Sequence, residues 1–79
     1  MYDELRESRA VRVEITRPGM IIRFNVQPVQ ESIDADHIYI SDVDQELDVN
    51  LGNCSVEEVG CGEYIFTHGD TEIYLASIA

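Results

Sequence analysis

Apolar and polar residues alternate along most of the chain with a period of two, as in strands that bury one face. Val11, Val13 and Ile15 alternate with polar residues, and the alternation resumes in MIIRFNVQ. Between them lies TRPG, in which Pro presets one turn position and Gly accepts positive φ at the next. The pattern therefore predicts a hairpin formed by residues 11–16 and 20–27.

The second half of the chain continues the alternation in short segments separated by turns. The candidates are HIYIS (37–41), ELDVNL (46–51), a weaker CSVEEV (54–59), and EYIFT (63–67) joined to EIYLASI (72–78) by a turn of hairpin type. Pro28 and a polar cluster predict an exposed connection over residues 28–36, and residues 2–9 predict at most one helical turn.

Short connections favour antiparallel pairing, since parallel strands need a crossover of about a dozen residues or more. We expect five to six of these segments to be strands of one domain spanning residues 1–79. The predicted fold is all-β, with or without the short N-terminal helical turn. It is a single small antiparallel sheet, a half-closed barrel or a two-layer sandwich.

Charge is distributed very unevenly along this pattern. The chain has 16 acidic and 5 basic side chains, a net charge of −11, and all five basic residues are arginines within residues 1–23. Residues 24–79 hold twelve acids and neither Lys nor Arg, which makes them −12. Such a surface repels phosphates and acidic membranes and attracts basic surfaces. We therefore expect no direct binding of nucleic acid or membrane, and a protein partner with a basic surface.

The acids are densest in ESIDADHIYISDVDQELDVN (31–50), where Asp42, Asp44, Glu46 and Asp48 recur at every second position. An EF-hand calcium loop is excluded, because it needs Gly at its sixth position and Glu at its twelfth, which here are Leu and Asn. A weak cation site of another kind remains an alternative. In an extended strand these acids lie on one face at ~6.6 Å intervals, a spacing of the same order as that of phosphates along nucleic acid. The simpler interpretation is an ordinary polar face directed to water.

No catalytic or cofactor-binding motif appears, so we expect neither enzymatic activity nor a bound metal or cofactor. His37 and His68 are isolated in sequence, and a triad of Ser32, His37 and a nearby acid has no local signature to support it. Cys54 and Cys61 are either two free thiols or a staple across a loop. A secretory signal and a membrane span are both absent from the pattern, which predicts a cytoplasmic protein.

Small size, β-strand patterning and unmixed acidity resemble in type the phage-encoded inhibitors that imitate DNA, namely anti-CRISPR proteins and uracil-DNA glycosylase inhibitors. VQESI (29–33) is similar to the Gln-Glu-Ser-Ile segment with which the glycosylase inhibitors engage their enzyme. This chain departs from that family in having two predicted strands before the segment and no helix after it. The resemblance implies that Glu31 and Ser32 are contact residues, that the acids between residues 34 and 48 add imitated backbone charge, and that the site of action is the host-cell cytoplasm.

Tyr39, Tyr64 and Tyr74 fall in three predicted strands, and aromatic rings beside carboxylates suit arginine-rich partners. The alternative is that these tyrosines line the edge of the core. Together with the acids, these observations define the candidate partner-binding residues Glu31, Ser32, Asp34, Asp36, Tyr39, Asp42, Asp44, Glu46 and Asp48.

The sequence thus predicts a non-enzymatic inhibitor that occupies the basic nucleic-acid channel of a host enzyme or CRISPR effector complex. The alternative is a structural or adaptor protein, such as a virion or assembly component. A halophilic protein, whose acidity answers the solvent, belongs to the same alternative. A homodimer is compatible with either function.

Overall fold

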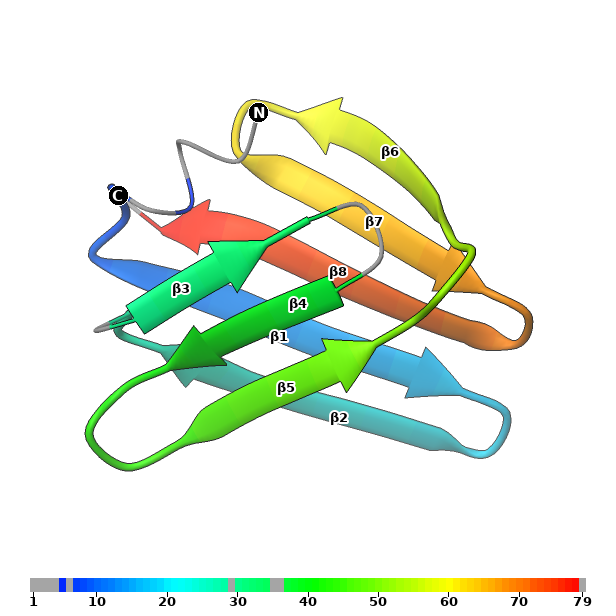
Figure 1. The fold of residues 1–79 in the computed structure, drawn as a ribbon, viewed down its shortest axis with the longest axis horizontal. Coiled ribbons are helices and arrows are strands. Elements are labelled where there is room, and N and C mark those ends of the chain that lie inside the picture. Colours follow the sequence, from blue (N-terminus) through cyan, green and yellow to red (C-terminus); the bar gives the residue numbers. More distant parts are fainter. Residues whose placement is uncertain (1–4, 6, 29, 35–36, 79) are drawn as a thin grey trace.

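The computed structural model describes residues 5, 7–28, 30–34 and 37–78, which include eight strands (Figure 1). Residues 2–4 and 6 of the predicted helical turn lie outside the described residues. The strands are β1 (Ala10–Arg17), β2 (Met20–Val26), β3 (Gln30–Ile33), β4 (His37–Ser41), β5 (Glu46–Asn50), β6 (Ser55–Gly60), β7 (Glu63–His68) and β8 (Thr71–Ile78).

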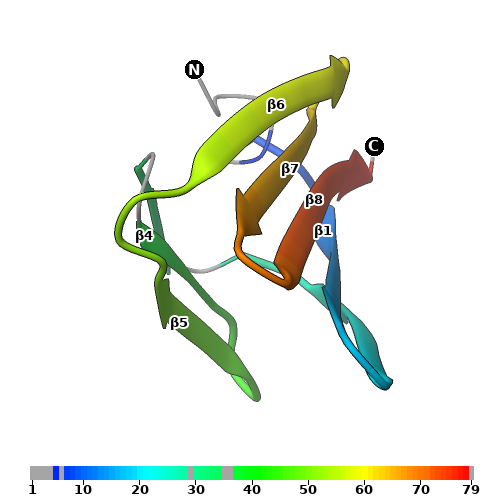
Figure 2. The same cartoon turned by 90° about the vertical axis from the view of Figure 1, so that its right-hand side faces the viewer.

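These strands form two antiparallel sheets. The larger sheet has five strands in the order β2-β1-β8-β7-β6, and the smaller has three in the order β3-β4-β5. Figures 1 and 2 show the two sheets as separate layers, which do not close into a barrel. The all-β antiparallel prediction is confirmed, in its two-layer form.

The expected number of five to six strands is too low, and the exposed connection predicted over residues 28–36 is wrong at its centre. Residues 30–33 form β3, which pairs with β4 so that Ile33 lies opposite Ile38. Ile33 is the only buried residue of this strand. One apolar residue gives no alternation to recognise, and the strand is specified by its pairing with HIYIS.

The predicted hairpin of residues 11–16 and 20–27 is confirmed by β1 and β2. Arg17 pairs with Met20 across a two-residue turn, in which Gly19 has a φ of +76°. This conformation carries little strain in glycine because glycine has no Cβ. The turn fixes the register that places Val13 opposite Phe24 on the inner face of the sheet.

The hydrophobic core lies between the two sheets and takes the inward residues of both. Burial of each large apolar side chain contributes about 1.5–3 kcal/mol relative to leaving it exposed. The core consists of Leu5, Val11, Val13, Val26, Ile33, Ile38, Ile40, Leu47, Leu51, Tyr64, Phe66, Ile73 and Leu75. Within the described part of the chain, no helix has the length and apolar character to cross a membrane.

Candidate functional site

The outer face of the three-stranded sheet carries side chains that alternate with the buried Ile38, Ile40 and Leu47. The register aligns Ser32, Tyr39 and Asp48 in one row across β3, β4 and β5. Glu46 lies in the next row, opposite Ser41. Glu46 and Asp48 are exposed, as predicted for acids that point away from Leu47 and Val49.

The predicted row of acids at every second position is interrupted, because Asp42 and Asp44 lie in the turn between β4 and β5 and not in a strand. Oδ1 of Asp42 accepts hydrogen bonds from the backbone N–H groups of Asp44 and Gln45, both at 2.8 Å. The bond from Asp44 is the main cause that lowers the pKa of Asp42 below its usual value. Asp42 therefore organises the turn, and its charge is already solvated by the chain.

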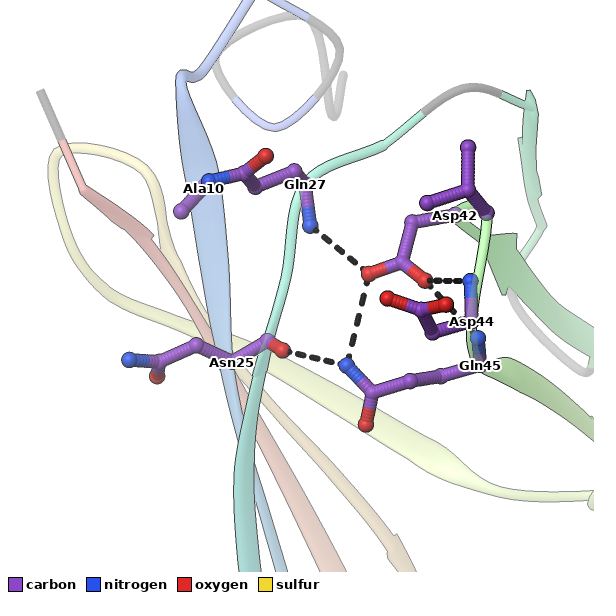
Figure 3. A pocket seen from close by; sticks show the side chains of 7 residues that line it. Ala10, Asn25, Gln27, Asp42, Asp44 and Gln45 are labelled. Carbon is purple, nitrogen blue, oxygen red and sulfur yellow. Dashed lines mark hydrogen bonds between the residues drawn. The ribbon is translucent and has the colours of Figure 1, made fainter.

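Asp42 also ties the turn to the five-stranded sheet (Figure 3). Its Oδ2 accepts a hydrogen bond from the backbone N–H of Gln27 at 3.3 Å. Nε2 of Gln45 donates to the carbonyl oxygen of Asn25 at 2.7 Å and to Oδ2 of Asp42 at 3.3 Å. These bonds fix the turn against the end of β2, beside a pocket of about 400 Å³ that also contacts Ala10, Val43 and Asp44.

Two acids near this tie are directed to solvent. The side chains of Asp44 and Glu46 are exposed, and their carboxylates form neither a hydrogen bond nor a salt bridge with the described residues. Since residues 24–79 contain no Lys or Arg, no basic side chain of β3, β4 or β5 offsets them. The outer face of this sheet with Glu46 and Asp48, together with Asp34 just after β3 and Asp44 in the β4–β5 turn, is called the acidic face below.

Asp48 is partly engaged by His37, whose Nε2 donates to Oδ1 of Asp48 at 2.7 Å. This contact is an ion pair only when the imidazole is protonated. Ser32 shares the face, but among the described residues no hydrogen bond joins it to His37. Ser32 and His37 therefore do not form the nucleophile–base pair that a triad requires.

The acids at the start of the stretch differ from this group. Glu31 lies on the inward side of β3, opposite the buried Ile40, and its Oε2 is buried. Asp34 is exposed just after β3, where its backbone N–H donates to the carbonyl of His37 at 2.8 Å. Asp36 lies outside the described residues. Of the VQESI segment, Ser32 therefore projects onto the acidic face, and Glu31 does not.

The three tyrosines do not share a face. Tyr39 is half-buried on the acidic face, whereas Tyr64 is buried in the core. Tyr74 lies on the outer face of the five-stranded sheet, where its hydroxyl donates to Oε1 of Glu63. This hydrogen bond is the main cause that raises the pKa of Tyr74. Of these three tyrosines, only Tyr39 lies on the acidic face.

Cys54 and Cys61 are not joined by a disulfide, and the loop staple is excluded by geometry. Cys54 precedes β6 and Cys61 follows it, so an extended strand of ~3.3 Å per residue holds them about 20 Å apart. A disulfide needs Cα atoms within about 4.4–6.8 Å. No cluster of three or more acidic, His or Cys side chains suited to a metal ion occurs in the described part of the chain.

Sequence reasoning missed the contacts made by Asn25, Gln27 and Gln45. A signal for the turn was present, because an Asp followed by polar residues between two strands is typical of an Asx turn. The tie to β2 had no such signal, since it joins residues from separate hairpins.

Comparison of the chain with protein-family models, curated proteins and solved structures finds no match.

Proposed function

We propose that the protein is a non-enzymatic inhibitor whose acidic face occupies the basic nucleic-acid site of another protein. The observation that carries this proposal is the unmixed charge of that face. Asp34, Asp44, Glu46 and Asp48 gather around one small sheet that contains no Lys or Arg. Ordinary soluble surfaces intersperse both signs, because unmixed charge repels itself and destabilises the fold.

The spacing of the acids supports imitation of a phosphate backbone. Glu46 and Asp48 project from alternate positions of β5, which are ~6.6 Å apart, and Asp44 extends the series into the turn. Phosphates follow each strand of a duplex at ~3.4 Å along the axis, so the two spacings are of the same order. The hydrogen bonds of Asp42 hold the turn in place, which reduces the entropy lost on binding.

The mechanism is competition for a cationic channel. Uncompensated charge steers the encounter and raises the association rate, and the contacts formed afterwards set the residence time. Tyr39 lies in the middle strand between Ser32 and Asp48, where its ring can stack on an arginine whose charge the neighbouring carboxylates bind. CRISPR effector complexes and uracil-DNA glycosylases are the candidate targets, from the resemblance in type and from VQESI.

Displacement of labelled DNA from a panel of these purified targets tests the proposal, with fluorescence anisotropy as the readout. The test variant combines Asp34→Asn, Glu46→Gln and Asp48→Asn. The control variant combines Glu57→Gln, Asp70→Asn and Glu72→Gln, which are exposed acids of the five-stranded sheet and its β7–β8 turn. Both variants remove three negative charges.

We expect the protein to displace DNA from at least one target at ~0.1 M salt, where charges still act over ~10 Å. The test variant should lose roughly tenfold or more in apparent affinity, and the control variant a few-fold at most. Equal losses in both variants would mean that net charge alone is sensed. Failure to displace DNA from every target in the panel would reject the proposal.

A further inference from the structure

The edge of β2 carries an apolar segment that is open to solvent. β2 is an edge strand of the five-stranded sheet. Three consecutive residues near its start are large and exposed: Met20 (45%), Ile21 (55%) and Ile22 (42%). Soluble proteins usually protect such an edge with charge, Pro or a bulge, because an exposed apolar edge pairs readily with another strand.

The register shows which backbone groups of this edge are available. Arg17 and Met20 close a two-residue turn and so form a hydrogen-bonded pair, after which such pairs alternate along the hairpin. Ile21, Arg23 and Asn25 consequently direct their N–H and C=O groups outward. The Asn25 carbonyl is already taken by Gln45. Among the described residues, the outward backbone groups of Ile21 and Arg23 have no hydrogen-bond partner.

We propose that a second copy of this chain pairs its β2 antiparallel with this edge, about a two-fold axis at Ile22. Ile21 of each copy then lies opposite Arg23 of the other, and each such pair exchanges two hydrogen bonds. Ile22 faces Ile22 in the closer, non-hydrogen-bonded position, and Met20 faces Phe24. The interface is isologous and joins the two five-stranded sheets into one continuous sheet.

The distribution of charge selects a second copy as the occupant. Two chains of net charge −11 repel each other. The β1–β2 hairpin is the exception, because it carries Arg12, Arg17 and Arg23 against the single acid Glu14. Arg23 and Glu14 are themselves joined at 2.6 Å. Copies that meet along β2 therefore approach through their least acidic part.

The same register adds an attraction between opposite charges. Gly19 of the second copy lies opposite Asn25, so its hairpin tip stops where the β4–β5 turn covers the edge. Arg17 of the second copy, beside that tip, comes next to Asp44 of the first, and the two-fold axis repeats this contact. Val43, 88% exposed on the same turn, gains cover from the tip. Of the acidic face, this contact uses Asp44, whereas Glu46 and Asp48 stay uncovered. The dimer is argued from the edge of β2 and does not rest on the proposed function.

Sedimentation velocity over a concentration series at ~0.15 M salt tests the dimer. Ile21→Pro removes an outward N–H that makes no bond to β1, at an edge position that tolerates Pro. Ile21→Thr keeps the N–H and is the matched control. We expect Ile21→Pro to weaken the dimer at least tenfold relative to Ile21→Thr. Circular dichroism of both variants verifies that they fold.

A charge exchange tests the register even if Ile21→Pro fails to fold. Arg17→Asp and Asp44→Arg should each weaken the dimer by roughly tenfold, and their combination should restore it. Arg12→Asp, on the outer face of β1 and away from the tip, is the control for the change in net charge. A monomer at all concentrations up to ~1 mM would overturn the proposal, as would a dimer that none of these changes weakens.

Discussion

The outer faces of the two sheets differ in whether their charged side chains have partners within the molecule. On the five-stranded sheet, Arg23 lies opposite Glu14 and binds it at 2.6 Å, and Tyr74 donates to Glu63. On the three-stranded sheet, Asp44 and Glu46 have no such partner among the described residues. The larger sheet thus pairs some of its charged side chains within the molecule, although Glu57 and Glu72 stay exposed. The smaller sheet has no Lys or Arg with which to do so.

The difference follows from how the chain is divided between the sheets. All five arginines precede residue 24, and β1 and β2, which carry three of them, both belong to the five-stranded sheet. The three-stranded sheet is built only from the part of the chain without Lys or Arg. An asymmetry along the sequence thus becomes an asymmetry between two surfaces.

The largest expected effect on stability concerns the packing that holds the three-stranded sheet in place. Its outer face contributes repulsion, so its attachment depends on the inner face, where Ile40 is fully buried on the central strand. Ile40→Ala should cost about 2–5 kcal/mol, which is most of the ~3–5 kcal/mol expected of a chain this small. Urea unfolding measures this cost, and Ser41→Ala on the outer face, expected within ~0.5 kcal/mol of the parent, is the control. An Ile40→Ala protein as stable as that control would contradict the prediction.

A smaller effect concerns the outer face of the five-stranded sheet. Tyr74→Phe removes the hydroxyl that donates to Glu63 and should lower the free energy of unfolding by about 1 kcal/mol at neutral pH. The pKa of Tyr74 is raised in the folded state, so this contribution is complete below the usual pKa of 10 and is lost as pH rises through the higher folded value. Denaturant midpoints at pH 7 and pH 11 should therefore differ more in the parent than in Tyr74→Phe. Equal pH dependence in both proteins would exclude this role.

Removing one acid from each face should change stability in opposite directions. Glu14→Gln breaks the salt bridge with Arg23 and should destabilise by about 0.2–1 kcal/mol at low salt. Glu46→Gln relieves repulsion and should stabilise by a few tenths of a kcal/mol. Thermal melts in ~0.05 M and 1 M KCl measure both effects, which should shrink at high salt because screening shortens to ~3 Å. Equal signs for the two variants would remove the contrast between the faces.

The parent protein in the same salt series separates the proposed inhibitor from a halophilic protein. A halophilic chain should be poorly folded at ~0.15 M salt and gain stability toward molar KCl, whereas an inhibitor that imitates DNA should already be folded.

The smallest effect concerns the β4–β5 turn. The folded-state pKa of Asp42 lies below the usual value of 3.8, so its contribution to stability is complete above that pH and is lost as pH falls through the folded value. Asp42→Asn should therefore lower stability at pH 7, where the ionised carboxylate contributes, and flatten the loss of stability below pH 4. Denaturation midpoints from pH 2 to pH 7 measure this, and Asp44→Asn, on the same exposed turn, is the control. An unchanged acid limb in Asp42→Asn would contradict the assignment.

The sequence predicts the fold well wherever apolar residues alternate, as in Val11, Val13 and Ile15. It fails for β3, where Ile33 alone is buried and Pro28 with the polar cluster resembles a loop. The Arg23–Glu14 contact could have been predicted, because the Pro18–Gly19 turn fixes the register that places them opposite each other. The packing of one sheet on the other leaves no trace in local sequence patterns. The contact between Gln45 and Asn25 could therefore not have been predicted from the sequence.

The same contrast between local pattern and long-range packing explains how much of the candidate site could be predicted. The outward direction of Glu46 and Asp48 follows from the period of two in ELDVNL. The inward direction of Glu31 follows only from its place opposite Ile40, and thus from recognising β3. Asp42 looked like a member of an acidic row, but hydrogen bonding to the backbone within the turn gives it a structural role.

The strand order of the larger sheet has a consequence for how the chain folds during synthesis. β8 lies between β1 and β7, and its register joins Thr16 to Glu72 and Ala10 to Ile78. The β1–β2 hairpin can form early from local contacts, but its partner strand is made last among the eight. Until then the edge of β1 has no strand beside it. Folding of the large sheet therefore ends with a slow, long-range closure, and the nascent hairpin is most vulnerable to aggregation just before β8 arrives.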